Sequence, residues 1–195
     1  MIQGMSAEEK EKPRVGNKDN WYKGSVAYWD SQPATVDGVL GGYGKIHEAE
    51  SDTSRIMLEE TRSIISGFNT ALDCGAGIGR IAKTTLLPVF KECDILEPSP
   101  VLIDKAKENV PNARNFYCQG LENFEFENKY DCIWVQWCMC YCTDSDLSSF
   151  LLKARTNGLN QSSDGKTGLV YVKENVAGAQ FILDKSDNSV MRTDK

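Results

Sequence analysis

The chain has 195 residues, of which 41% are hydrophobic and 26% are charged. This length fits one globular domain, and this composition excludes a disordered or fibrous protein. The formal net charge is −6, and no cluster of lysine and arginine is present that could follow a phosphate backbone. We therefore expect no nucleic-acid partner.

The sequence favours a protein that neither spans a membrane nor is secreted. Its longest apolar run, over 132–142, is shorter than the roughly 18 to 20 residues that cross a bilayer, and no secretory signal is recognisable. Seven cysteines without a CxxC pair are typical of free thiols in a reducing compartment. We expect a cytoplasmic or nuclear location, or both, and no membrane partner.

The single histidine, His47, limits two classes of site. Cys138, Cys140 and Cys142 would share one face of a strand, but a structural zinc site needs four ligands, so we expect no metal. A Ser-His-Asp or Cys-His hydrolase is disfavoured as well, because only His47 could act as its base.

The N-terminal third of the chain is predicted to contain a tail, a loop and a helix. Residues 1–20 are expected to form a flexible tail, and 21–195 a folded domain. The glycine-rich stretch over 38–44 predicts a flexible loop. A helix is predicted from position 51 or 52 to about 66, with Gly67 as its terminator. Its inner side is expected to carry four hydrophobic residues: Ile56, Met57, Ile64 and Ile65.

From residue 70 onwards, apolar runs that predict strands alternate with helical periodicity. The predicted strands are 70–74, 93–97, 115–118, 132–136 and 168–172. Helices are expected after Gly79, from Ser99 as N-cap with Pro100, and from Thr143, whose spacing to Asp146 resembles a capping box. This order predicts an α/β fold with a mostly parallel sheet, flanking helices and a ligand site beyond the carboxyl ends of the strands.

A glycine turn follows the first of these strands and indicates a nucleotide-type site. The stretch GAGIG at 75–79 has Arg80 where a dinucleotide fingerprint needs its third glycine, so NAD and FAD are disfavoured. Glu97 ends the second strand, where a carboxylate can accept hydrogen bonds from ribose hydroxyls. The stretch over 72–79 resembles motif I of class I methyltransferases, which bind S-adenosylmethionine, and this resemblance implies a Rossmann-like fold.

Further stretches resemble a narrower family, the protein α-N-methyltransferases that modify Xaa-Pro-Lys N-termini. They are TVDGVLGGYG at 35–44, DCIWVQW at 131–137, KEN at 173–175 and ILDKSDNSV at 182–190. The resemblance implies a methyltransferase domain over 21–195, with a helical and glycine-loop substrate cap over 21–66 and a Rossmann-like core over 67–195.

The same resemblance assigns the site residues. It implies S-adenosylmethionine contacts at Gly75, Gly77, Arg80, Glu97, Pro98, Ser99, Leu121, Glu122 and Gln136. It implies a substrate site at Trp29, Leu40, Trp137 and Asp184, and catalytic roles for Asp187 and Asn175. For Arg80 there is an independent reason, because a guanidinium can hold the cofactor's carboxylate in a bidentate pair.

The sequence also departs from the family pattern. Tyr141 stands where the family has a histidine, and because tyrosine is a poor base at neutral pH, proton removal would depend on Asp187, water or solvent. Glu97 replaces the usual aspartate and Glu122 the usual glutamine. The fold would normally continue beyond residue 195 with a helix and two more strands, so we expect an uncovered sheet edge and an isoform or incomplete gene product.

The implied activity is methylation of exposed Xaa-Pro-Lys N-termini in proteins, giving one, two or three methyl groups. Two alternatives stay open at this point. One is an inactive or truncated family member that binds cofactor or peptide without turnover. The other is a class I methyltransferase that acts on a small molecule, against which the TVDGVLGGYG stretch argues.

Overall fold

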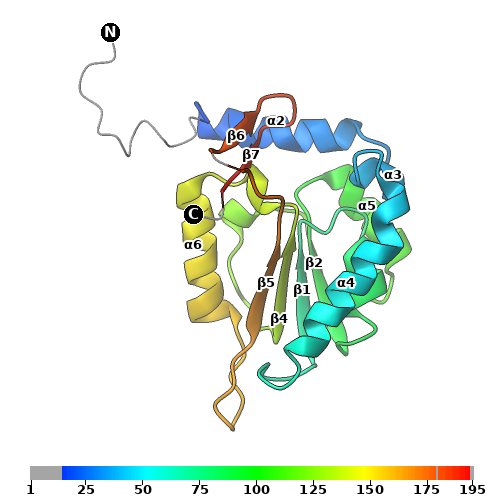
Figure 1. Cartoon of the computed structure of the whole chain (residues 1–195), viewed down its shortest axis with the longest axis vertical. Coiled ribbons are helices and arrows are strands. Elements are labelled where there is room, and N and C mark those ends of the chain that lie inside the picture. The colour runs from blue at the N-terminus through cyan, green and yellow to red at the C-terminus, as the bar shows by residue number, and fades with distance from the viewer. Residues whose placement is uncertain (1–14, 179, 194–195) are drawn as a thin grey trace, which may run out of the picture.

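A parallel sheet of five strands in the order β3-β2-β1-β4-β5 forms the centre of the computed structural model, which describes residues 15–178 and 180–193 (Figure 1). Its strands are β1 (Thr70–Cys74), β2 (Glu92–Leu96), β3 (Phe116–Tyr117), β4 (Cys132–Gln136) and β5 (Leu169–Lys173). The α-helices are α2 (Lys18–Ser31), α3 (Val36–Val39), α4 (His47–Glu60), α5 (Pro100–Asn109) and α6 (Asp144–Lys153). An antiparallel hairpin of β6 (Ile182–Asp184) and β7 (Ser189–Met191) follows the sheet.

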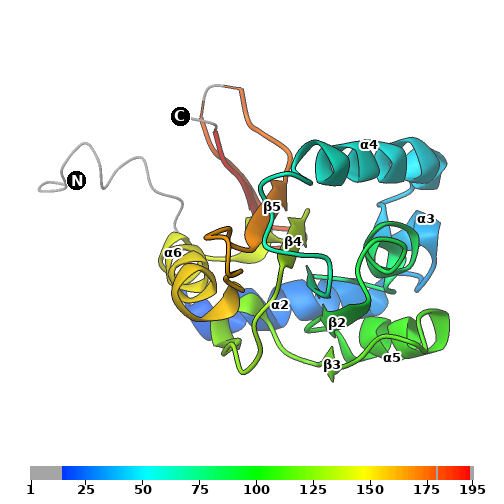
Figure 2. The same cartoon turned by 90° about the horizontal axis from the view of Figure 1, so that it is seen from below.

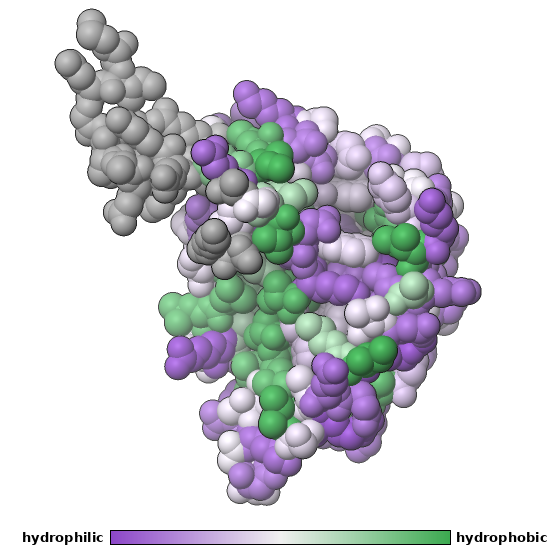
Figure 3. All heavy atoms as spheres, viewed as in Figure 1, coloured by the Kyte–Doolittle hydropathy of each residue, from purple (hydrophilic) through white to green (hydrophobic). Residues whose placement is uncertain are grey.

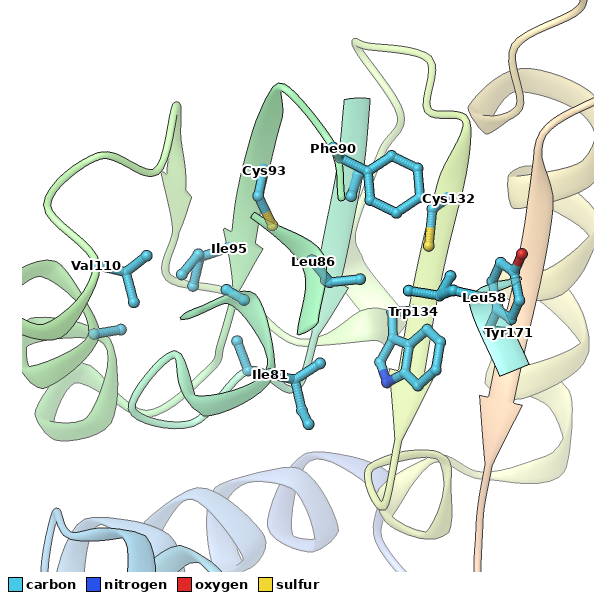
Figure 4. Packing of buried hydrophobic residues seen from close by; sticks show 14 of the residues in the cluster. Leu58, Ile81, Leu86, Phe90, Cys93, Ile95, Val110, Cys132, Trp134 and Tyr171 are labelled. Atoms are coloured by element: carbon cyan, nitrogen blue, oxygen red, sulfur yellow. The ribbon is translucent and has the colours of Figure 1, made fainter. Parts of the chain in front are cut away.

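Helices cover both faces of the sheet, as Figure 2 shows from below. Alternate residues of each strand point to opposite faces. Trp134 belongs to one core cluster, with Leu58 of α4 and Ile103 of α5, whereas Ile133 belongs to a second cluster, with Phe150 of α6. Trp134 also stacks on Tyr171 of β5, with ring centroids 5.2 Å apart (Figure 4). β4 is buried along its whole length, as expected for a central parallel strand.

The helix α2 crosses the carboxyl ends of the strands, and the hairpin β6–β7 lies beside it (Figure 1). The side chain of Trp21 on α2 donates a hydrogen bond from Nε1 to the carbonyl of Tyr141, at 2.6 Å. Asn188, in the hairpin turn, donates from Nδ2 to the carbonyl of Trp21, at 2.9 Å. These contacts place the N-terminal helix and the C-terminal hairpin over the end of the sheet where ligands bind in such folds.

The predicted sheet is confirmed. β1 and β4 have the predicted bounds, and β2, β3 and β5 differ from the prediction by one residue at each end. Ser99 caps α5 by accepting a hydrogen bond from the amide of Leu102, and Thr143 caps α6 by accepting one from the amide of Asp146. The helix predicted after Gly79 is short and continues as a π-helical turn, Ala82–Leu86.

Three expectations for the N-terminal third were wrong in part. The helix α4 begins at His47 and ends at Glu60. Thr61 bonds back to the carbonyls of Met57 and Leu58 there, and the following residues join a bridge in which Ile65 pairs with Thr167. Ile65 is buried as predicted, and Met57 is partly buried against the core. Ile56, within α4, and Ile64 are exposed, and the buried hydrophobic residue of α4 is Leu58.

The other two corrections concern the loop and the tail. The glycine-rich stretch is partly helical, because Thr35 caps α3 and Gly44 begins a 3₁₀ turn, Gly44–Ile46. Of the predicted tail over 1–20, the first 14 residues lie outside the described part, and α2 already begins at Lys18. No helix in the described part is long and apolar enough to span a membrane.

The last described segment forms the hairpin, although the sequence suggested a polar ending. Arg192 anchors it by donating hydrogen bonds to the carbonyl of Cys142, at 2.7 Å, and to the carboxylate of Asp144. β5 is one of the two edge strands of the parallel sheet, and an uncovered edge was expected there. Val172 on β5 and Leu152 on α6 are exposed, and Figure 3 shows hydrophobic atoms gathered over these elements.

Candidate active site

A pocket at the carboxyl ends of β1, β2 and β4 brings together all the residues to which the resemblance assigned cofactor contacts. They are Gly75, Gly77, Arg80, Glu97, Pro98, Ser99, Leu121, Glu122 and Gln136. Trp29 from α2 and Trp137 after β4 line the same pocket. The parallel strands deliver these side chains to one edge of the sheet, and α2 closes the pocket from above.

The glycine turn after β1 has a conformation that glycine favours. Gly75, Gly77 and Gly79 have φ angles of 62°, 56° and 77°, a region in which side chains are strained. A Cβ atom on Gly75 would collide with Cys138, and one on Gly79 would lie 2.6 Å from Val110. Gly75 and Gly79 therefore permit close packing, and Gly77 presents its backbone at the pocket wall.

Glu97 is buried at the end of β2 and is held by backbone amides. It accepts hydrogen bonds from the amides of Gly77 and Ser99, both at 2.8 Å. Burial nevertheless raises the pKa of Glu97 to about 7. The carboxylate is thus fixed at the pocket wall, where its remaining lone pairs can accept the two hydroxyls of a ribose.

Arg80 lies in the pocket wall as part of a buried ion pair. Its Nη1 donates to Glu50 of α4 and lies 3.2 Å from His47 Nδ1, and its guanidinium carbon is 5.7 Å from the ring centroid of Trp137. The sequence did not identify Glu50, because the predicted helix started at position 51 or 52, after Glu50, whereas α4 starts at His47. The spacing of Glu50, Ser54 and Leu58, all buried, is the helical signal that would have identified it.

One side of the pocket is aromatic. Trp29 and Tyr141 meet edge to face with ring centroids 6.1 Å apart. Trp137 has a φ of 54°, an unusual conformation for a non-glycine residue, which is often found at functional sites. Glu174, which the sequence did not identify as a site residue, supports this turn by accepting a hydrogen bond from the amide of Met139, at 2.7 Å.

Asp187 lies next to this aromatic wall. The hydroxyl of Tyr141 donates to Asp187 Oδ2 at 3.4 Å, and Asp187 Oδ1 is buried without a hydrogen-bond partner in the described structure. Burial raises the pKa of Tyr141 far above neutral, so its hydroxyl keeps its proton. A buried carboxylate oxygen without a donor is costly, and a donor group of a ligand would satisfy it.

The other residues with predicted substrate-binding or catalytic roles lie outside the pocket lining within the described ranges: Leu40, Asn175, Asp184 and Asp187. Leu40 is buried next to Val39, which does line the pocket. Asn175 and Asp184 are exposed, and Asp184 Oδ1 accepts a hydrogen bond from the amide of Ser186 at 2.8 Å. Cys138, Cys140 and Cys142 lie around a 3₁₀ turn and not in a strand. Among the described residues, no group of three or more His, Cys, Asp or Glu side chains could hold a metal ion.

Comparison with known proteins agrees with this geometry. The sequence pattern of a family described as AdoMet dependent proline di-methyltransferase matches residues 17–195. The chain belongs to this methyltransferase family. Its cofactor is therefore S-adenosylmethionine, and the glycine turn, Glu97 and Arg80 form a site that fits this molecule, because they offer a backbone cradle, an acceptor for ribose hydroxyls and a cation for a carboxylate.

Individual relatives cover most of the chain. Alpha N-terminal protein methyltransferase 1 of Arabidopsis thaliana is 40% identical over 99% of this chain and 73% of its own length. N-terminal Xaa-Pro-Lys N-methyltransferase 1 of Bos taurus is 39% identical over 91% of this chain and 81% of its own. A solved SAM-dependent methyltransferase of Leishmania major superimposes with a TM-score of 0.80 at 31% identity, over 96% of this chain and 74% of that one.

We expect cofactor affinity to rise with pH between 6 and 8, because the site contains buried acids that titrate in this range. The pKa of Glu97 is about 7, and burial raises that of Asp73, also at the pocket wall, to about 7. An ionised Glu97 is the better acceptor for ribose hydroxyls, so binding favours loss of its proton. For one such group the affinity rises about tenfold over this interval.

Calorimetric titration with S-adenosylhomocysteine at pH 6, 7 and 8 measures this dependence. In the chain without ligand, the raised pKa values of Glu97 and Asp73 also make the free energy of unfolding depend on pH, but in the opposite direction to the cofactor affinity. Because the folded state holds these protons more tightly than the unfolded state, the free energy of unfolding falls as the pH rises towards 7. An affinity that stays constant or falls over this range would contradict the prediction.

Proposed function

We propose that this enzyme transfers methyl groups from S-adenosylmethionine to the free α-amine of proteins that begin with Xaa-Pro-Lys. The names of the relatives from Arabidopsis thaliana and Bos taurus support the reaction and the substrate class. The observation that carries the proposal within this chain is the buried oxygen of Asp187, which has no partner among the described residues. It lies beside an aromatic wall that lines the cofactor pocket, where an amine would supply the missing donor.

On the cofactor side, each residue has a distinct task. We assign the ribose hydroxyls to Glu97, the amino-acid carboxylate to Arg80, and the backbone cradle to Gly75 and Gly77. The remaining contacts are assigned to Pro98, Ser99, Leu121, Glu122 and Gln136. When bound, S-adenosylmethionine supplies an electrophilic methyl group on its sulfonium.

Proton removal from the substrate precedes attack by its nitrogen. An α-amine has a pKa of about 7.7 to 8.0, so most of it is protonated at neutral pH. We assign the acceptor role to Asp187, with Tyr141 as a donor that fixes the orientation of the carboxylate and with Asn175 orienting the peptide terminus. Orientation of the amine and exclusion of water by α2 and the aromatic wall then supply most of the rate enhancement.

Substrate selection follows from the aromatic wall and from one exposed carboxylate. We assign the second-position proline to Trp29, Trp137 and Leu40, because a rigid, apolar ring fits a wall of aromatic side chains. We assign the third-position lysine to Asp184. Hydrogen bonds from Ser186 lower the pKa of Asp184, so its carboxylate is charged at neutral pH.

We also infer that the protein works in the cytoplasm or the nucleus. All seven cysteines are free, and burial raises the pKa of six of them well above that of an exposed thiol, as for Cys74 and Cys132. Buried free thiols of this kind are typical of proteins in a reducing compartment.

The substrate class is tested with peptides that begin Ser-Pro-Lys and Ser-Pro-Gln, each with the intact chain and with D184N. With the intact chain, we expect kcat/KM for the Ser-Pro-Gln peptide to be about tenfold lower than for the Ser-Pro-Lys peptide, because one ion pair with a charged hydrogen bond is lost. With D184N the two peptides should react at similar rates. D164N, which alters an exposed aspartate in the turn before β5 at the opposite end of the sheet, is the matched control. Equal rates for both peptides with the intact chain would contradict the assignment.

A further inference from the structure

A buried cluster centred on Glu50 lies behind the cofactor pocket. Glu50 Oε1 accepts hydrogen bonds from Gln136 Nε2 at 2.6 Å, from Lys173 Nζ at 2.9 Å and from Ser54 Oγ at 3.0 Å. Its other oxygen, Oε2, accepts from Arg80 Nη1. Glu50 belongs to α4, whereas three of its partners come from the turn after β1 and from the ends of β4 and β5. One carboxylate thus joins four segments of the chain.

Two of these partners, Arg80 and Gln136, also line the cofactor pocket. The amide of Gln136 is fixed at both ends, because its Oε1 accepts a hydrogen bond from Trp134 Nε1 at 3.0 Å while its Nε2 donates to Glu50. Arg80 is held through Nη1, and in the described structure its Nε and Nη2 are without a protein acceptor. The rest of the guanidinium is therefore available to an anion in the pocket.

The carboxylate of Glu50 stays charged in spite of its burial. Its side chain is only 6% exposed, which opposes ionisation, yet hydrogen bonds from Lys173 and the charge of Arg80 lower the pKa of Glu50 to about 2. Within the described ranges, Glu50 is the acid that forms ion pairs with both Arg80 and Lys173. Removing its charge would leave two cations in this region without their shared counterion.

We infer that Glu50 is a positioning residue of the cofactor site, which holds Arg80 and Gln136 in the orientation that receives the amino-acid end of S-adenosylmethionine. The inference rests on the proposed contact between Arg80 and the cofactor carboxylate. Glu50 touches neither cofactor nor substrate. It acts by fixing the direction of two side chains that do, because a charged hydrogen bond to each restricts its rotamers.

The test compares two ligands that differ only in the amino-acid end of the cofactor. S-adenosylhomocysteine has the amino-acid group, and 5′-methylthioadenosine has the same adenosine and thioether without it. Glu50→Gln replaces the carboxylate by an amide, whose NH₂ group would face either Arg80 or the donors of Gln136 and Lys173. We expect the Kd of S-adenosylhomocysteine to rise about tenfold, as for loss of one charged hydrogen bond, and that of methylthioadenosine to change less than twofold.

Matched variants separate positioning from general damage. E59Q makes the same substitution on the same helix at an exposed ion pair with Arg62, and both affinities should stay unchanged. If circular dichroism shows that E50Q does not fold, E50D is tested in its place. This variant keeps the charge on a side chain that is one methylene shorter. We expect it to lose less than about tenfold in affinity for S-adenosylhomocysteine and to keep its affinity for methylthioadenosine.

Three results would overturn the inference. The first is an unchanged affinity for S-adenosylhomocysteine in a folded variant, and the second is an equal loss for both ligands, which indicates structural damage. The third is an intact chain that binds the two ligands equally well, because the proposed contact of Arg80 with the carboxylate then fails too. If the intact chain prefers S-adenosylhomocysteine and the variants keep that preference, only the role of Glu50 is wrong.

Discussion

Replacing Arg80 with lysine is expected to weaken the binding of S-adenosylhomocysteine about 100-fold, which corresponds to about 2.7 kcal/mol. Lysine keeps the positive charge but loses the planar fork that can bind Glu50 and a ligand carboxylate at the same time. The lysine ammonium would stay with the buried Glu50, and the carboxylate of the cofactor would lose its partner. Isothermal titration calorimetry measures this loss directly.

The matched control is R55K, which makes the same substitution at an exposed arginine of α4. Arg55 donates to the carbonyl of Thr84 and pairs with Asp52, and its replacement should leave both ligand affinities unchanged. Binding of methylthioadenosine to R80K should change little, because that ligand has no carboxylate. Retention of full affinity for S-adenosylhomocysteine by R80K would show that the carboxylate binds elsewhere.

Replacing Asp187 with asparagine is expected to lower kcat for methyl transfer about 100-fold or more, the usual effect of losing a positioned proton acceptor. The affinity for S-adenosylhomocysteine should stay within twofold, because Asp187 lies outside the lining of the cofactor pocket as described here. Asparagine keeps the size of the side chain and can still accept from Tyr141. The change therefore removes the charge and the basicity with little change in shape.

Steady-state kinetics with a Ser-Pro-Lys peptide separate this role from substrate binding. D184N, at the proposed lysine contact in the same hairpin, should raise KM more than it lowers kcat. Raising the pH towards 9 should restore part of the rate of D187N, because solvent then deprotonates the α-amine without help from the protein. Equal losses of cofactor affinity and rate in D187N would contradict the proposed role.

The sequence predicted the sheet and the meeting of the glycine turn, Glu97 and Arg80 in one pocket, because both depend on local signals. The apolar run of β4, the caps at Ser99 and Thr143, and the glycine turn with Arg80 each lie within a few consecutive residues. The parallel topology then brings the ends of β1, β2 and β4 to one edge. No contact between distant segments had to be known to place Gly75 and Glu97 in one pocket.

Contacts between distant segments explain what the sequence did not reveal. Glu50 is separated from Arg80 by 30 positions and from Lys173 by 123, and no local pattern connects them. The exposure of Ile64 depends on where α4 ends, which the bridge between Ile65 and Thr167 helps to decide. Tertiary pairing overrides helical periodicity in that segment.

The contacts of Tyr141 also depend on distant segments and could not be predicted from the sequence. The sequence showed a tyrosine where the family has a histidine, and it indicated a poor base. The structure adds that its hydroxyl donates to Asp187 and that its ring meets Trp29 edge to face. Tyr141 cannot accept the substrate proton at neutral pH. It instead forms part of the pocket wall and donates a hydrogen bond to Asp187, the carboxylate that we propose as the proton acceptor.

Methylation at the α-amine can be measured by mass spectrometry of a Ser-Pro-Lys peptide incubated with the intact chain and S-adenosylmethionine. The same peptide with an acetylated α-amine, which keeps its lysine side chain, is the control, and D187N is the catalytic blank. We predict mass gains in steps of one methyl group on the free peptide alone. Gains on the acetylated peptide, or none on either peptide with an enzyme that binds S-adenosylhomocysteine, would contradict methylation of the α-amine by this enzyme.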